Sequence, residues 1–534
     1  MPDRVPPSTA PAGDDPSPAE PNATSPPPDA PTDRSDTLTA RTVRGMKWSY
    51  LSTFVHSVLQ IGFSALLARL LEPAAFGLVA LAGVVLNFGS YFAKMGIASA
   101  VVQKETLSRE EVHAAFLLST GLGILFFGAM WVAAPAAALL FDETSLVPIV
   151  RALALSFLIT GIETSASSLL RRRLDFRSLA LISILSYLLG YGAVGVPMAY
   201  TGYGVWSLVA ASLTKSLIHA ILVHATVRHG VSWVRTGARY RYFFSFGSRV
   251  SINGFLEFLG GNLDTMTIGR YIGAGPLGLY NRAYMLAFVP LMKLGSGLSK
   301  VLLPSLSRLQ SDTPRLRRVY LAAIGVLGAV IAPTCAGMMV VSTDIVMVLL
   351  GDQWTGAVPV LRVLALAVCF NLLTHLAAVT CEATARLNIK IQIQVLHIGL
   401  LVLFFWLLFD YGLVGIAIGF LMAECVRHVA YALTVHRALE MSWANQMRAY
   451  GPALTNALVI GGVLYGVSAA TTAAGWPLAG RFALELGVSA LLLAGLILYG
   501  PLASVRDDIG RMLDRLAPGP VTTRLVRLFP PPSQ

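Results

Sequence analysis

The chain has 534 residues, of which 55% are hydrophobic and only 13% are charged, and its mean hydropathy is +0.67. This composition excludes a water-soluble globular protein, and apolar runs of about 20 residues, long enough to cross a bilayer, recur along the chain. The formal net charge of +12 is typical of basic cytoplasmic loops and does not by itself indicate a nucleic-acid partner. The composition therefore predicts an all-α polytopic membrane protein.

The first 40 residues are rich in Pro, Ser, Asp and Ala and hold almost no large apolar side chains. They predict a disordered, Pro-rich cytoplasmic tail (1–40) rather than a cleavable signal peptide. We see no phosphate-binding loop, zinc motif or nucleophile elbow, so we expect no enzyme, no cofactor and no metal. The four cysteines lie in apolar segments without metal-ligand spacing, and we expect them to be free: Cys335, Cys369, Cys381 and Cys425.

The hydrophobic runs predict about fourteen membrane spans. Every second connection between them is rich in Arg or Lys, and the connections in between are short or acidic. The positive-inside rule then places both termini in the cytoplasm. The predicted spans are 47–70, 74–95, 113–138, 146–169, 178–200, 203–227, 242–272, 278–303, 318–341, 357–383, 388–409, 412–436, 451–472 and 480–502.

The sequence also repeats itself. Segments 68–78 and 269–279 share an Arg, a short turn and a Gly-Leu pair, at an offset of 201 residues. A Tyr-Gly pair at 203–204 recurs at 411–412. These matches predict two parallel-repeat six-helix lobes related by an axis along the membrane normal. Chance similarity between short Gly-Leu turns is the alternative. The predicted domains are 41–241 and 242–450 for the lobes, 451–503 for two additional spans and 504–534 for a basic cytoplasmic tail.

The most polar of the long apolar segments is 242–272. In it Arg249, Asn253, Glu257 and Asp264 fall close to one face of a helix, at about 100° per residue. A carboxylate in the middle of a bilayer costs several kcal/mol unless it faces water or a partner, so this stripe is expected to line a cavity. Asn253, Glu257 and Asp264 are therefore candidates for cation coupling. The alternative is a polar ladder that only holds helices together.

Two parallel lobes favour a transporter that holds its substrate between them. Lys215 and Lys293 lie midway along their spans, and Arg282 lies nearer the outer end of its span. Together with Arg249 they form the predicted substrate-binding set. Arg and Lys suit an anion, above all a phosphate or diphosphate, which a guanidinium can hold with two hydrogen bonds. For each of these cations the alternative is a side chain that extends to the membrane surface.

Other ionisable residues in the spans have more ordinary explanations. Glu163 is an acid in the middle of its span and is either functional or a hydrogen-bonded core residue. Glu424, Arg427 and His428 are spaced i, i+3 and i+4, so we expect them to neutralise one another.

Seven short segments carry a resemblance to a known family: Asn262–Asp264, Ile268–Arg270, Gly278–Tyr280, Arg282–Tyr284, Arg44–Gly45, Ala68–Leu71 and Phe76–Gly77. In these segments the chain resembles polysaccharide-transport proteins of the multidrug/oligosaccharidyl-lipid/polysaccharide flippase superfamily, which includes O-antigen and colanic-acid flippases. The resemblance covers about residues 41–500 and implies two six-helix lobes, alternating access and export of undecaprenyl-diphosphate-linked glycans. It also allows coupling to a cation gradient, a role that it carries to Asp264 only.

We therefore predict a multi-pass flippase of the bacterial inner membrane for a lipid-linked oligosaccharide, a precursor of a lipopolysaccharide or exopolysaccharide. Its expected partners are that substrate, membrane lipids and proteins of polysaccharide polymerisation and assembly, with no nucleic acid. One alternative is a drug/cation antiporter of the same superfamily, which would favour acidic cavity residues. Another is a non-transporting scaffold of a glycan-assembly complex, and a membrane glycosyltransferase comes third.

Overall fold

The computed structural model describes residues 33–499, apart from 95–96, 105–106, 228–257 and 385. All regular secondary structure in this part of the chain is helical. Twelve of its helices are long and apolar enough to cross a membrane. The prediction of an all-α polytopic membrane protein is confirmed.

The helices follow one another with short connections. In chain order they are α1 (Asp33–Leu70), α2 (Pro73–Lys94), α3 (Ile97–Gln103), α4 (Arg109–Phe141), α5 (Leu146–Arg172), α6 (Phe176–Tyr187), the π-helix η1 (Leu188–Gly195), α7 (Val196–Tyr200), α8 (Val205–Val227), a helix over 258–271, α10 (Ala274–Arg308), α11 (Thr313–Val340), α12 (Ser342–Leu349), η2 (Asp352–Trp354), α13 (Ala357–Ala383), α14 (Leu387–Leu407), η3 (Phe409–Tyr411), α15 (Gly412–Ala438), α16 (Trp443–Ala473) and α17 (Leu478–Tyr499).

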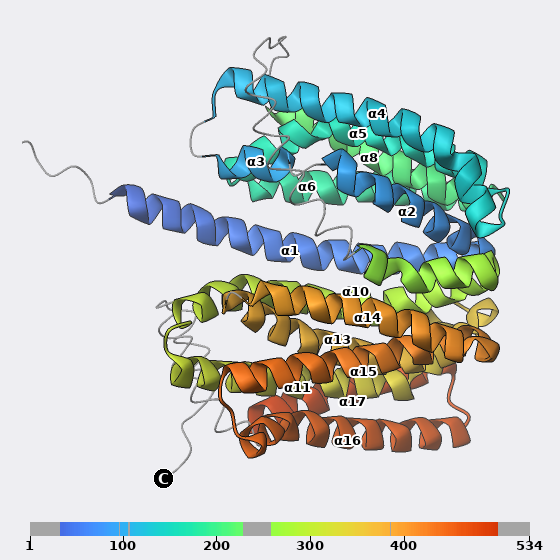
Figure 1. Cartoon of the computed structure of the whole chain (residues 1–534). Helices are drawn as coiled ribbons and strands as arrows, with labels where there is room; N and C mark the ends of the chain where they lie inside the picture. Colours follow the sequence, from blue (N-terminus) through green and yellow to red (C-terminus); the bar gives the residue numbers. More distant parts are fainter. Residues whose placement is uncertain (1–32, 95–96, 105–106, 228–257, 385, 500–534) are drawn as a thin grey trace, which may run out of the picture. The chain divides into compact units, whose positions relative to one another are not determined.

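Helix packing divides these elements into two groups (Figure 1). In the first group, α5 packs against α2, α4 and α8, and α8 also packs against α6 and η1. In the second group, α13 packs against α10, α11, α14 and α15. Because these helices surround it, α13 is one of the most buried helices. Helix α16 lies along α11, and α17 packs on α16. The groups meet directly where α2 packs against α10.

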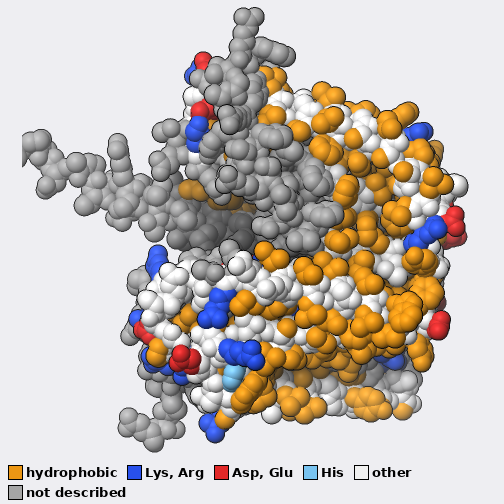
Figure 2. Space-filling model, viewed as in Figure 1, with side chains coloured by type: hydrophobic (Ala, Val, Ile, Leu, Met, Phe, Trp, Pro, Cys, Tyr) orange, Lys and Arg blue, Asp and Glu red, His pale blue; other side chains and the backbone are white. Residues whose placement is uncertain are grey.

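The surface matches a bilayer. Hydrophobic side chains cover much of the face shown in Figure 2, and Lys, Arg, Asp and Glu side chains gather toward its two ends. Large apolar side chains such as Val132, Leu139 and Leu491 are exposed by 76 to 80%. Such exposure would be costly in water but is expected where lipid covers the protein.

Twelve predicted spans coincide with the twelve helices that can cross a membrane. The count of fourteen stays a prediction, because 242–272 lies partly outside the described residues and α10, which contains 278–303, is not among the twelve. Helix α1 begins at Asp33, before the predicted end of the tail at residue 40. After Pro31 the next proline is Pro73, so no proline prevents the helix from extending toward the N-terminus.

Polar caps explain several helix starts. Ser108 and Glu111 form a reciprocal capping box at the start of α4. The side chains of Asp175, Asp312 and Ser442 accept hydrogen bonds from the first turns of α6, α11 and α16. These residues set where the spans begin and so fix the register of their polar side chains.

The contact between α2 and α10 is made by the two copies of the repeated turn. Pro73 and Ala274 begin α2 and α10 and stand at equivalent places in the repeat, as do Gly77 and Gly278. A Cβ atom at Gly77 would overlap the carbonyl oxygen of Ala274, and one at Gly278 would overlap that of Pro73. The contact is therefore reciprocal, as expected for a pair related by a two-fold axis. Only glycine permits backbones to approach so closely.

Candidate functional site

A guanidinium lies where α1, α2 and α10 meet. Arg282 of α10 donates from Nη1 to Ser64 Oγ on α1 at 2.5 Å and from Nη2 to the side chain of Asn281 at 2.7 Å. The guanidinium carbon is 4.4 Å from the ring centre of Phe76 on α2. Its Nε is buried and has no hydrogen-bond partner, and Arg282 forms no ion pair within the described part of the chain. A cation inside a membrane protein without a carboxylate is a candidate to hold an anionic ligand.

Two stacked tyrosines stand beside this guanidinium. Tyr187, the last residue of α6, and Tyr191 of η1 have ring centres 4.6 Å apart at an interplanar angle of 19°. The charge of Arg282 acts on both phenol groups. Lys215 Nζ of α8 is 5.7 Å from the centre of the Tyr187 ring. Tyr187 thus interacts electrostatically with two predicted substrate cations, and we call Tyr187, Tyr191, Lys215 and Arg282 the aromatic–cation cluster.

The π-helix and its glycines position Lys215. A Cβ at Gly190 would lie 2.7 Å from both the carbonyl oxygen of Ala211 and the Cβ of Lys215, and one at Gly195 would lie 2.9 Å from the Cβ of Ala211. Glycine therefore lets α8 pack close to η1 at the turn that carries Lys215. A π-helix is rare and often occurs at functional sites, and here it sets the orientation of Tyr191.

An acid also lies near Lys215. Glu163 Oε1 of α5 lies 2.9 Å from His219 Nδ1. The negative charge of Glu163 also acts on Lys215. His219 is one helical turn beyond Lys215 on α8. The sequence showed no acid near Lys215 because Glu163 is on another helix. Lys215 is therefore partly compensated by Glu163, whereas Arg282 has no carboxylate partner among the residues that the structure describes.

Asp264 is buried, with 5% of its surface exposed. Its Oδ2 accepts a hydrogen bond from Tyr280 Oη at 2.7 Å, and its Oδ1 accepts one from the backbone N–H of Thr265 at 2.7 Å. Both the coupling hypothesis and the ladder hypothesis for this residue are compatible with these contacts. The rest of the predicted stripe, Arg249, Asn253 and Glu257, lies outside the described residues.

One predicted substrate cation, Lys293, and two other arginines near helix ends, Arg270 and Arg362, remain to be placed. Lys293 belongs to α10, and its side chain lies outside the described part. Arg362 donates to Ser342 Oγ at 2.8 Å and to Thr343 Oγ1 at 3.1 Å. Arg270 donates to the carbonyl oxygen of Leu139 at 3.2 Å. Arg362 and Arg270 therefore tie helix ends together.

A second polar network lies within the second group of helices. Glu424 of α15, 1% exposed, pairs with Arg427 at 2.6 Å and accepts from Asn371 Nδ2 of α13 at 3.3 Å. His428 instead contacts Thr374 Oγ1 and Tyr450 Oη, each at 3.1 Å. The predicted neutralisation of Glu424 by Arg427 is confirmed, but His428 hydrogen-bonds to Thr374 and Tyr450 and not to Glu424.

Sequence reasoning missed the aromatic members of the cluster and Ser64. Tyr187 and Tyr191 are four residues apart in a Gly-rich span, a spacing that places both rings on one helix face. This spacing was the sequence signal that could have indicated the tyrosine pair. Nothing in the sequence linked Ser64 to Arg282, which is 218 residues away.

Comparison with solved structures shows which known fold the chain shares. A structure titled lipid II flippase MurJ, inward closed conformation, matches with a TM-score of 0.67 at 12% sequence identity, covering 85% of this chain and 98% of that one. The chain thus shares the fold of that membrane protein.

The sequence comparisons then identify the family. Residues 66–359 match the family described as polysaccharide biosynthesis protein, and the chain belongs to that family. It is 26% identical over 416 residues to the lipopolysaccharide biosynthesis protein WzxC of Escherichia coli K12, covering 76% of this chain and 83% of the relative. It is 30% identical over 335 residues to the succinoglycan biosynthesis transport protein ExoT of Rhizobium meliloti, covering 62% and 67%. The predicted resemblance is confirmed.

Proposed function

We propose that the chain is a flippase of the bacterial inner membrane that moves a polyprenyl-diphosphate-linked oligosaccharide across the membrane by alternating access. Relatives named for lipopolysaccharide biosynthesis and succinoglycan transport, and a fold shared with a lipid II flippase, support this substrate class. The observation that carries the proposal is Arg282, a half-buried guanidinium without an ion pair among the described residues, beside the tyrosine pair.

The aromatic–cation cluster suits a diphosphate. Arg282 and Lys215 both supply positive charge near Tyr187, and the phenol groups can donate further hydrogen bonds to phosphate oxygens. The spare Nε of Arg282 adds one more donor. The polyprenyl tail stays in the surrounding lipid, so only the polar head needs a protein pathway. Arg249 and Lys293 belong to the same proposed substrate set.

The two lobes are proposed as 41–241 and 242–450, with 451–503 as an additional pair of spans. They rock around the substrate while the reciprocal α2–α10 contact opens and closes one end of the pathway. Both termini are proposed to lie in the cytoplasm, where the substrate is loaded. Polymerase and assembly proteins are the proposed partners, because they use the glycan after transport.

Asp264 is the proposed coupling residue, with Glu257 and Asn253 of the same predicted span. It binds a proton or another cation in one state and releases it in the other, which links transport to a gradient. The hydrogen bond from Tyr280 of α10 supports this role, because it joins the acid to the helix that carries Arg282.

Deletion of the gene in its host tests the proposal. Lipid-linked oligosaccharide should accumulate on the cytoplasmic face, and the parent gene should remove it. A Lys215→Ala, Arg282→Gln double variant that reaches the membrane should leave the accumulation in place. If the double variant restores export fully, the diphosphate site is wrong. If deletion causes no accumulation but purified protein moves an organic cation, the chain is an antiporter.

A further inference from the structure

We infer that a cavity between α2, α4 and α5 is a sugar-binding subsite, which takes the first sugar attached to the diphosphate. This inference rests on the proposed function and goes beyond it, since it assigns a neutral carbohydrate site to residues outside the aromatic–cation cluster. The cavity has a volume of about 160 Å³, which suits a group of the size of one sugar ring.

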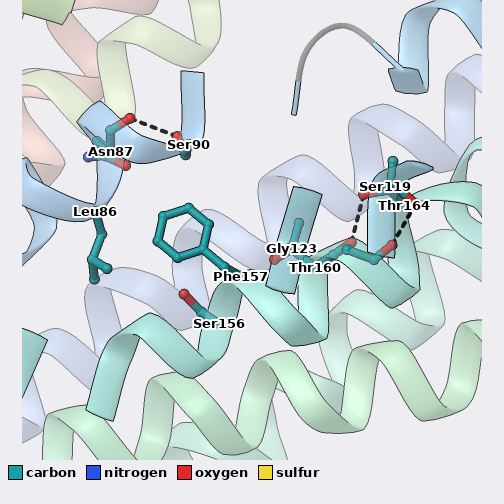
Figure 3. A pocket seen from close by; sticks show the side chains of 10 residues that line it. Leu86, Asn87, Ser90, Ser119, Gly123, Ser156, Phe157, Thr160 and Thr164 are labelled. Atoms are coloured by element: carbon teal, nitrogen blue, oxygen red, sulfur yellow. Dashed lines mark hydrogen bonds between the residues drawn. The ribbon is translucent and has the colours of Figure 1, made fainter. Parts of the chain in front are cut away.

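The lining of the cavity is polar but uncharged (Figure 3). None of its ten lining residues carries a charge, and four of them are apolar or glycine: Leu86, Gly123, Phe157 and Gly161. A charged ligand would find no counter-charge in this wall, and an apolar ligand would leave its polar groups without partners. A neutral ligand with many hydroxyl groups fits best. The polar side chains are Asn87, Ser90, Ser119, Ser156, Thr160 and Thr164.

The hydrogen bonds within the wall leave it rich in acceptors. Ser119 Oγ donates to the carbonyl oxygen of Gly161 at 2.7 Å, Thr164 Oγ1 to that of Thr160 at 2.6 Å, and Ser90 Oγ to that of Asn87 at 2.9 Å. Each hydroxyl has one proton, which these bonds use, and two lone pairs that remain available. Sugar hydroxyls can donate to those lone pairs. The exposed amide of Asn87 offers both a donor and an acceptor.

Packing of α4 on α5 holds these hydroxyls in place. A Cβ at Gly123 would lie 2.6 Å from the carbonyl oxygen of Phe157, and one at Gly161 would lie 2.6 Å from that of Ser119. The two helices therefore touch through glycine backbones at the floor of the cavity. Phe157, which is buried, closes one side with an apolar surface.

The position of the cavity agrees with the chemistry of a lipid-linked glycan. Thr160 and Thr164 precede and follow Glu163 within about one turn of α5. Glu163 contacts His219 and acts on Lys215, a member of the aromatic–cation cluster. The turn of α5 that carries two of the cavity's hydroxyl groups is thus linked through Glu163 to a cation proposed to hold the diphosphate. In the substrate the first sugar is bonded directly to that diphosphate, so the two subsites must be neighbours.

Ordered water is the other occupant that such a lining can accept. Binding measurements on the purified full-length protein in nanodiscs separate the two. The probes are undecaprenyl diphosphate and the same lipid carrying glucose, galactose or N-acetylglucosamine. We expect tighter binding of at least one glycosylated probe. In a Thr160→Val, Thr164→Val double variant that advantage should fall about five- to tenfold, as for the loss of one or two hydrogen bonds, while binding of the bare diphosphate stays unchanged.

Matched controls test the interpretation. Thr226 of α8 donates to a carbonyl one turn back, as Thr164 does, but is exposed and outside the cavity, so Thr226→Val should retain the sugar advantage. Thr164→Ser keeps the hydroxyl and should keep most of the advantage, which guards against misfolding as the cause.

Three results decide the outcome. If the double variant keeps the full sugar advantage, the cavity is not a sugar subsite. If the parent binds the bare diphosphate as tightly as all three glycosylated probes, the inference fails while the proposed function stands. If the parent binds none of the probes, the proposed function itself fails, and the inference fails with it.

Discussion

Two roles are possible for Arg282, a ligand-binding residue and a clamp between helices, and they predict different effects of substitution. Its bond to Ser64 joins α10 to α1, so Ser64→Ala removes that clamp but keeps the charge. Arg282→Gln removes the charge. If the guanidinium holds the diphosphate, Arg282→Gln should weaken binding of undecaprenyl diphosphate about 10- to 100-fold, the range for charge-assisted hydrogen bonds, and Ser64→Ala should weaken it far less. Equal losses in both variants, with equal losses of thermal stability, would identify a purely structural residue.

Asp264→Asn separates cation coupling from a structural hydrogen bond. The amide can accept from the Thr265 N–H through oxygen and donate to Tyr280 Oη through nitrogen, so both contacts can persist. Coupling predicts normal thermal stability, strongly reduced export and no response to an imposed pH or ion gradient. The ladder hypothesis predicts near-normal export.

The matching control is Tyr280→Phe, which takes away a partner of Asp264 without changing the acid. It should destabilise the protein by about 1–3 kcal/mol because a buried acceptor loses its donor. Export by Asp264→Asn at the parental rate, with its gradient response intact, would leave Asp264 without a coupling role.

At the level of helices, the reciprocal glycine contact makes a sharp prediction. Gly77→Ala places a methyl group against the carbonyl oxygen of Ala274, so α2 and α10 must move apart. The free energy of unfolding of the purified protein should fall by about 1–3 kcal/mol, the usual cost of overpacking. Gly278→Ala should cause a similar loss, because it makes the same contact from the other side.

Gly83 provides the control within α2. A Cβ there meets nothing within 4 Å, so Gly83→Ala should be neutral or slightly stabilising, since alanine favours helix. Equal stabilities of the Gly77→Ala and Gly83→Ala proteins would show that the α2–α10 contact contributes little to the folded state.

The sequence predicted the spans well because a bilayer demands long apolar helices, and apolar length can be read without knowing the neighbours of a helix. The repeated turn was also visible, since its glycines recur at a fixed offset. That the two turns would touch was not visible. Close approach depends on which helix faces which, and hydropathy does not encode that.

The candidate site was predicted in part for the same reason. Lys215 and Arg282 stood out as cations within spans, but the interaction of both with Tyr187 depends on packing between helices distant in sequence. For the same reason, the sequence did not predict the interaction of Glu163 with Lys215 or the hydrogen bond from Tyr280 to Asp264. The cavity of serines and threonines gave no signal, because hydroxyl groups are common in apolar helices, where they bond to the preceding turn.

Orientation in the membrane decides from which side the substrate enters, and α5 offers the test. At about 1.5 Å per residue its 27 residues span about 40 Å, so the connections at its two ends must lie on opposite sides of the membrane. The alternation of basic and acidic connections predicts that Asp142 faces the periplasm and that the Arg-rich turn after α5 faces the cytoplasm.

The structure selects the labelling positions. Arg172 donates hydrogen bonds to the carbonyl oxygens of Val101 and Lys104, so replacing it would disturb its surroundings. Arg173 is exposed and suits a cysteine better, and so does the exposed Asp142. A membrane-impermeant maleimide added to intact spheroplasts should label Asp142→Cys and leave Arg173→Cys unlabelled until the membrane is opened. The parent, with three buried cysteines and the half-buried Cys425, sets the background. If only Arg173→Cys were labelled in intact spheroplasts, the orientation would be the reverse of the predicted one. The substrate would then be loaded on the wrong side of the membrane for an exporter.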